Sequence, residues 1–251
     1  MFQSIQKQVL PDQIFEQIRD QILLGHLKVG DHLPSERKLC ALFNVNRGAI
    51  REALKKLQQL GLIHIQQGGK TQVLNFYQTA SINLLPDLLL LNQQMNPHVV
   101  YSVLELRLAL GQDVARLCSI RMNETQRQQL QNIVQDMQAT NDVAQRENYS
   151  SQFWHLLVTG ANNIAYQLAF NTLSQTFTLM RTALHDLLAH EWNSIEDYQQ
   201  LIVAMEHKQT QDIQTIINHL LTSPTQAQDF FATQPNVLKL IEFNQDLSSK
   251  V

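Results

Sequence analysis

Apolar residues recur at intervals of three and four along most of the chain, a spacing that predicts amphipathic helices. The first such stripe predicts a helix from about Pro11 to Leu24, with buried positions at Ile14, Ile18, Ile22 and Leu23. Strand-like alternation replaces this spacing near Ile63, Ile65 and Val73, where it predicts two short strands. The pattern therefore predicts a mainly helical chain with one small hairpin.

The stretch between residues 33 and 69 predicts two helices joined by a tight turn. Ser35, directly behind Pro34, is a good N-cap for the first helix, and Asn44 is a suitable C-terminal stop. Asn46 then caps a second helix, which ends at Gly61 because glycine readily adopts the left-handed conformation. The expected inward faces of the two helices consist of Leu39, Leu42 and Phe43, and of Ile50, Ala53, Leu54 and Leu57.

Two helices followed by a hairpin is the order of a winged helix-turn-helix, a module whose second helix enters the DNA major groove. Arg47 and Arg51 lie four residues apart, so they project from one side of that helix, opposite its apolar face. The turn Gln67-Gly68-Gly69-Lys70 is the expected wing, and His32-Leu33 is expected to form a short strand beside it. We therefore predict that the N-terminal region binds double-stranded DNA.

Helical spacing dominates after Asn75, which predicts an all-α bundle of about seven helices. With breaks at Pro, Asn and Gly positions, the expected helices lie near 80–92, 96–121, 123–143, 146–159, 162–190, 194–206 and 209–221, with a further one near 225–247. We expect a winged helix-turn-helix DNA-binding domain over 1–75, a linker over 76–83, and an all-helical effector-binding and dimerisation domain over 84–251.

The charge is divided unevenly between the two parts. Residues 1–75 hold ten Lys/Arg against six Asp/Glu, whereas residues 76–251 hold nine against sixteen. The positive part is the predicted DNA-binding part, as phosphate attraction requires, and the acidic remainder argues against a general nucleic-acid coat protein. We find no membrane-spanning run and no signal peptide, and Cys40 and Cys118 fall in different predicted domains, so a reduced, cytoplasmic protein is expected.

The segment PSERKLCALFNVNRGAIREALKKLQQLGLI, residues 34–63, resembles the DNA-binding domain of the GntR family of bacterial transcription regulators. Its PSER box, its R-x-x-x-R-E-A-L pattern and its L-x-x-x-G-L-I ending carry the resemblance. The following stretch from Val73 to Leu85, together with Arg107, resembles the FadR group of acyl-CoA-responsive regulators of fatty-acid metabolism. The resemblance implies a ligand-responsive regulator released from its operator by long-chain acyl-CoA. The alternative is a GntR-type regulator that responds to a metal-bound or free small carboxylate.

Geometry and resemblance together give the candidate DNA contacts, which are Arg37, Asn46, Arg47, Gly48, Arg51, Gln67, Gly68 and Lys70. Arg47 and Arg51 are favoured over plain surface charges because arginine offers a fork that pairs with guanine O6 and N7. Arg37 is otherwise an ion-pair partner of a nearby acid, and Asn46 is otherwise only a cap. Gly48 and Gln67 depart from the FadR pattern, which has threonines and a histidine there, so the base preference is expected to differ. Lys70 is expected to contact phosphate.

The resemblance places the effector near Arg107 and Tyr198. Arg107 lies on an otherwise apolar helix face, so it is either paired with a carboxylate or kept for an anionic ligand. The stripes that either line a ligand tunnel or form plain core, the favoured role for most of them, are Leu104, Leu108, Val114, Phe170, Leu173, Phe177 and Met180. Many GntR relatives bind a metal, but Ser151 stands where the Asp preceding His155 is required and His219 is one residue off, so no metal is expected.

An enzyme and an architectural DNA protein are the competing classes. The sequence has no P-loop, no G-x-S-x-G, no HExxH and no dinucleotide fingerprint, so neither enzyme activity nor a cofactor other than an acyl-CoA effector is expected. The large acidic helical part argues against an architectural protein. We expect a C2 homodimer that brings two recognition helices to a short palindromic operator, and a ligand that moves the linker near 76–81 and lowers the affinity for DNA.

Overall fold

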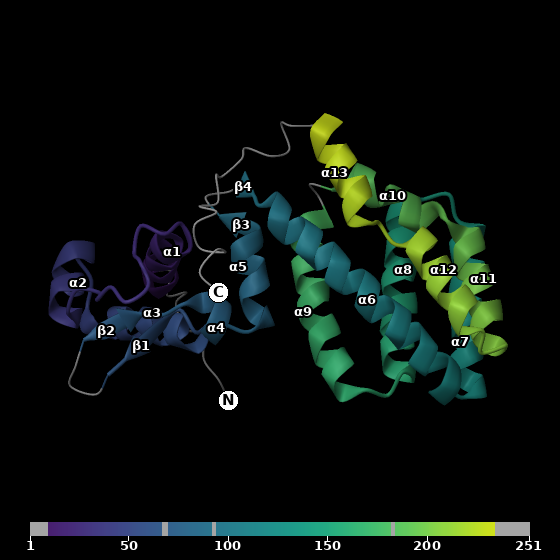
Figure 1. The fold of residues 1–251 in the computed structure, drawn as a ribbon, viewed down its shortest axis with the longest axis horizontal. Coiled ribbons are helices and arrows are strands. Elements are labelled where there is room, and N and C mark those ends of the chain that lie inside the picture. The colour runs from purple at the N-terminus through teal and green to yellow at the C-terminus, as the bar shows by residue number, and fades with distance from the viewer. Residues whose placement is uncertain (1–9, 67–69, 92–93, 182–183, 234–251) are drawn as a thin grey trace, which may run out of the picture. The chain divides into compact units, whose positions relative to one another are not determined.

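The computed structural model describes residues 10–66, 70–91, 94–181 and 184–233 (Figure 1). These residues form two compact units, and the chain passes from one to the other between residues 91 and 94. Helices dominate both units, which confirms the predicted mainly-α class with a winged helix-turn-helix near the N-terminus and few strands. No helix in the described ranges combines the length and the apolar character needed to cross a membrane.

The first unit contains the predicted winged helix-turn-helix. Its elements are α1 (Leu10–Leu23), α2 (Glu36–Phe43), α3 (Arg47–Gln59), β1 (Ile63–Ile65), β2 (Thr71–Val73), α4 (Phe76–Thr79), the 3-10 helix η1 (Ile82–Leu84), α5 (Leu85–Leu89) and β3 (Leu90–Leu91). Helix α3 packs against α1 and β1, and α2 packs against α3 (Figure 1). Helix α3 is thereby packed against three elements, which are α1, α2 and β1.

The predicted caps of the helix-turn-helix are confirmed. The Ser35 hydroxyl accepts the backbone N–H of Lys38 at 3.3 Å, and the chain leaves α2 at Asn44 with a left-handed φ of 52°. The Asn46 side chain accepts the backbone N–H of Ala49 at 2.9 Å and starts α3. These contacts turn the chain sharply enough to bring the start of α3 beside the start of α2.

The predicted inward face of α3 is confirmed, because Ile50, Ala53, Leu54 and Leu57 are all buried in the core of this unit. The antiparallel hairpin pairs Ile63 with Val73, and His32 bridges to Gln72 as the expected third strand. One expectation was wrong: Leu42 is 64% exposed, because the side of α2 that packs into the core is formed by Leu39, Cys40 and Phe43.

The segment after the hairpin packs with the first unit. Phe76, Leu84 and Leu91 belong to the same hydrophobic core as α1 and α3. The Thr79 hydroxyl donates to the Gly61 carbonyl at 2.7 Å, which ties α4 to the turn that follows α3. Apolar residues beyond residue 75 thus complete the core of the first unit, and the predicted boundaries at 75 and 83 remain predictions. The roles assigned to the domains remain predictions.

The second unit is built from helices. Its described elements are β4 (Gln94–Met95), α6 (Pro97–Arg121), α7 (Glu124–Ala139), α8 (Val143–Gly160), α9 (Ile164–Arg181), α10 (His185–Asn193), α11 (Ile195–Glu206), α12 (Thr210–Leu220) and α13 (Pro224–Thr233). The long α6 packs against α8, α9, α11, α12 and α13 (Figure 1). The helix expected over 162–190 is two helices, α9 and α10. The helix expected near 225–247 is observed as α13, and its remainder lies outside the described residues.

Candidate functional site

The exposed side of α3 carries two arginines. The side chains of Arg47 and Arg51 are 67% and 61% exposed, whereas Ile50 and Leu54 on the opposite side are buried. The first two turns of a helix that projects cationic forks into solvent have the form of a major-groove reading surface. The structure therefore leaves both arginines accessible to a duplex.

Both arginines share one carboxylate. Glu36, the first residue of α2, accepts the Arg47 Nε–H at 2.6 Å and the Arg51 Nε–H at 3.1 and 3.2 Å through its two oxygens. The hydrogen bond from Arg47, despite an opposing contribution from burial, holds the pKa of Glu36 below its usual value. The acid is therefore ionised at neutral pH and belongs to the same surface, although the sequence pattern did not single it out.

The remaining candidate DNA contacts belong to the helix-turn-helix or to the sequence segment 67–70 that precedes β2. Arg37 is exposed, and no ion pair to it is found in the described part of the chain. Gly48 is exposed, and an added Cβ there would meet only the Asn46 side chain, at 3.2 Å. Lys70 is exposed at the start of β2. Gln67 and Gly68 lie outside the described residues, and for all eight positions DNA contact remains a prediction.

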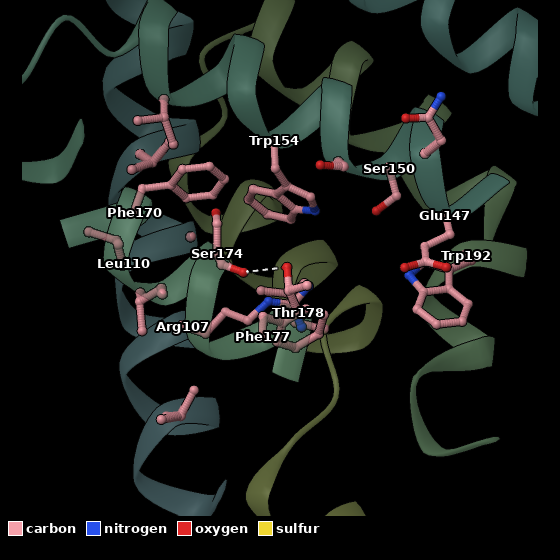
Figure 2. Close-up of a pocket in the computed structure, with 18 of the residues that line it drawn as sticks. Arg107, Leu110, Glu147, Ser150, Trp154, Phe170, Ser174, Phe177, Thr178 and Trp192 are labelled. Carbon is pink, nitrogen blue, oxygen red and sulfur yellow. Dashed lines mark hydrogen bonds between the residues drawn. The ribbon is translucent and has the colours of Figure 1, made fainter. Parts of the chain in front are cut away.

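A cavity of about 350 Å³ lies inside the helical unit (Figure 2). It has mostly apolar and aromatic walls, contributed by α6, α8, α9, α10 and Leu221. Polar groups on the wall include the hydroxyls of Ser150, Ser174 and Thr178 and the carboxylate of Glu147. A concave, apolar cavity with a few polar groups is the usual form of a small-molecule site.

Arg107 lines this cavity but is not free. Its two Nη atoms donate to the two carboxylate oxygens of Glu191 at 2.7 Å each, and its guanidinium lies 4.2 Å from the centre of the Phe177 ring. Glu191 is fully buried and also accepts the backbone N–H of Thr222 at 2.7 Å. Burial by itself would raise the pKa of Glu191, but the charge and hydrogen bonds of Arg107 lower it below its ordinary value. Of the two alternatives for Arg107, the structure shows the paired one.

Tyr198 is fully buried in the core of the helical unit and is not part of the cavity wall. Its hydroxyl is 2.8 Å from the hydroxyl of Ser150, which does line the cavity. Burial raises the pKa of Tyr198 far above its usual range, so the phenol stays protonated. The tyrosine is therefore linked to the cavity wall only through Ser150, and its contact with an effector remains a prediction.

Some of the apolar residues that were expected either to line a ligand tunnel or to form plain core line the cavity, and others do not. Val114, Phe170, Leu173 and Phe177 line the cavity, whereas Leu104 and Leu108 do not; the side chain of Met180 lies outside the described part. The sequence pattern missed Glu191, because nothing local distinguishes it from Asp186 on the same helix as a partner of Arg107. It also missed the two tryptophans of the chain, Trp154 and Trp192, which form part of the cavity wall.

Two histidines of the helical unit that were weighed as metal ligands lie close to protein oxygen atoms. His219 Nδ1 lies 2.8 Å from an Asp197 carboxylate oxygen, and His155 Nδ1 lies 3.1 Å from the Ser151 carbonyl oxygen. Within the described ranges, no three His, Cys, Asp or Glu side chains gather as a set of metal ligands. The absence of a metal remains a prediction.

Comparison with known families bears directly on both units. The model of bacterial regulatory proteins of the gntR family matches residues 10–73, and the model of the FadR C-terminal domain matches residues 74–228. The chain belongs to the GntR family. Its second domain is of the FadR type, and the protein is a GntR/FadR-type DNA-binding transcription regulator rather than an enzyme.

Two bacterial regulators are similar in sequence to this GntR-family protein. The HTH-type transcriptional regulator Mce2R of Mycobacterium tuberculosis is 32% identical over 203 residues, covering 81% of this chain and 85% of the relative. A fatty acid metabolism regulator protein of Escherichia fergusonii is 28% identical over 174 residues, covering 68% of this chain and 69% of the relative. The similarity therefore extends across both units of the regulator.

Proposed function

We propose that this regulator controls genes of fatty-acid metabolism and that a long-chain acyl-CoA, bound in the cavity of the helical unit, releases it from its operator. The apolar cavity is the observation that carries the proposal. Each methylene of an acyl chain moved from water into such a cavity contributes about 0.8 kcal/mol. The likeness to a fatty acid metabolism regulator protein supports the proposed role in fatty-acid metabolism. The proposed place of action is the cytoplasm, where the DNA is found.

The alternative effector is a small carboxylate, free or metal-bound. Arg107 on the cavity wall favours it, because guanidinium groups bind carboxylates in a bidentate manner. However, Glu191 already occupies both Nη atoms, and a ligand carboxylate would have to displace a buried acid. The acyl thioester, whose recognition relies on apolar burial, needs no such exchange and is the preferred effector.

The regulator is proposed to act as a homodimer on a short palindrome, with one α3 in each half-site. Ligand binding must then favour a conformation that presents the two reading helices less well, since a ligand shifts an equilibrium only by its differential affinity. The segment 76–81 is the proposed route, because α4 is tied to the turn that follows α3.

Replacing Arg47 by alanine tests the DNA-reading surface. We expect specific binding to weaken by about 1–3 kcal/mol, because a bidentate base contact is lost, while the fold remains intact. The measurement is a gel-shift titration with a duplex that the wild-type protein selects from a random library. Arg116→Ala, which removes a surface arginine of α6, is the control and should leave the affinity unchanged. Equal affinity of the Arg47 variant and wild type would exclude Arg47 as a base contact.

Filling the cavity tests the effector proposal. Ser174 lines the cavity, and Ser174→Phe should occupy its space and weaken the release of DNA by palmitoyl-CoA at least tenfold, with little change in DNA affinity. Gln175→Phe adds the same ring at an exposed neighbouring position outside the cavity and should respond as wild type does. Release is followed by fluorescence anisotropy of labelled DNA, with coenzyme A alone and succinate as further ligands. Release by succinate but not by palmitoyl-CoA would select the alternative effector.

A further inference from the structure

The carboxylate of Glu36 accepts hydrogen bonds from both arginines that are predicted to read DNA. Glu36 is on α2, 29% exposed, and it contacts arginines eleven and fifteen residues away on α3. It is the one residue that joins both predicted reading side chains within the described part of the chain. Its position on a different helix means that the helix-turn-helix packing, not local sequence, places it there.

The contacts with Glu36 leave the Nη atoms of Arg47 and Arg51 available for hydrogen bonds to a partner. A guanidinium has five N–H donors, one on Nε and four on the two Nη atoms. Glu36 takes the Nε–H of Arg47 at 2.6 Å and that of Arg51 at 3.1 Å. No hydrogen bond from the Nη atoms of either arginine is found to another described residue. The end of each fork, where two parallel donors point outward, is thus left for a partner.

We infer that Glu36 is a positioning residue that sets the sequence discrimination of this regulator by fixing Arg47 and Arg51 end-on toward the bases. The inference rests on the proposed DNA-reading role of these arginines. Two flexible side chains held by one carboxylate lose less freedom on binding a guanine edge than two free ones. A guanine presents O6 and N7 as a matched pair of acceptors for such a fork.

The same carboxylate opposes indiscriminate binding. Non-specific binding depends on the attraction between cationic side chains and phosphates. Glu36 offsets one of the two positive charges and holds both side chains away from other orientations. A phosphate that does not lie in front of the two Nη ends can bind the arginines only if they leave this acid. A guanine in front of those ends uses donors that the acid does not occupy. Glu36 is therefore expected to weaken non-specific binding more than specific binding.

Removing the charge of Glu36 tests the inference. The ratio of specific to non-specific affinity is measured with the selected duplex and a scrambled duplex of equal length, on the full-length protein. Glu36→Gln should lower this ratio about tenfold, and the salt dependence of non-specific binding should steepen by about one unit as an arginine is freed for phosphate. Glu52 is an exposed acid on α3, and it has no hydrogen-bond or ion-pair partner among the described residues. Glu52→Gln removes the same charge and should leave the ratio near that of wild type.

A second variant separates charge from position. Glu36→Asp keeps the charge but withdraws the carboxylate by one methylene, so it should lower the ratio without changing the salt dependence. It also decides the matter if Glu36→Gln fails to fold, as judged by circular dichroism. Equal ratios for Glu36→Asp, Glu52→Gln and wild type would overturn the inference.

The experiment also distinguishes this inference from the proposed function. In an Arg47→Ala background, Glu36→Gln should cause a smaller loss of discrimination, because one of the side chains it positions is gone. If Arg47→Ala weakens specific binding and Glu36→Gln behaves as Glu52→Gln does, only the positioning role is lost. If Arg47→Ala has no effect, the proposed reading surface fails and the positioning role falls with it.

Discussion

Replacing Arg107 by alanine is expected to lower the free energy of unfolding of the helical unit by about 3–5 kcal/mol. The substitution removes the partner of Glu191, which is fully buried and would keep a carboxylate without a countercharge. It also removes the cation that lies 4.2 Å from the Phe177 ring. Both tryptophans belong to this unit, so their fluorescence in a denaturant titration of the full-length protein reports the loss.

Arg116→Ala is the matched control on the same helix. Arg116 pairs with Asp113 at the surface, with a side chain 36% exposed, and such pairs contribute about 0–1 kcal/mol. A loss for Arg107→Ala no larger than for this control would contradict the buried-pair account. The double change Arg107→Met with Glu191→Leu should restore much of the stability, because it removes both charges together.

Arg107→Ala should also weaken the response to palmitoyl-CoA more than it weakens binding to DNA, because Arg107 lines the cavity and is remote in sequence from α3.

The stability that the ion pair between Arg107 and Glu191 contributes depends on pH. Since the folded protein holds the pKa of Glu191 below its ordinary value, this stability is present at neutral pH and is lost as the pH falls through the lowered pKa.

Gly61→Ala should destabilise the winged-helix unit by about 2–5 kcal/mol. Gly61 has a φ of 75°, which disfavours any residue with a Cβ, and that Cβ would lie 2.4 Å from the Thr79 carbonyl oxygen. Backbone would therefore have to move at the point where α4 is tied to the turn after α3. Hydrogen exchange of the amides in α3 and β1 measures the loss in the full-length protein.

Gly25→Ala separates the two causes. Gly25 has a similar φ of 73°, but an added Cβ there meets nothing within 4 Å, so only the backbone strain of about 1–2 kcal/mol is expected. The excess loss at Gly61 then measures the close packing of α4. Equal losses at both glycines would show that α4 yields without cost, and would weaken its proposed part in carrying the effector signal.

The ends of α2 and α3 and the buried face of α3 can be predicted from the sequence alone. Asn46 and Asn44 cap and stop helices through groups within three or four residues of themselves, and Ile50 and Leu57 are buried as helical spacing requires. Leu42 shows the limit of this reasoning, because periodicity identifies an apolar face but not how much of it another element covers.

The sequence by itself thus determined the winged helix-turn-helix, the helical second part and the outward direction of Arg47 and Arg51, since these depend on neighbours along the chain. Only the tertiary structure decided that Glu191, 84 residues from Arg107, accepts both of its Nη donors. It also decided that the Tyr198 hydroxyl lies beside that of Ser150, and that Glu36 pairs with both Arg47 and Arg51. Such partners are chosen by which helices pack together. That packing arises from the burial of many apolar side chains at once, and no local pattern records it.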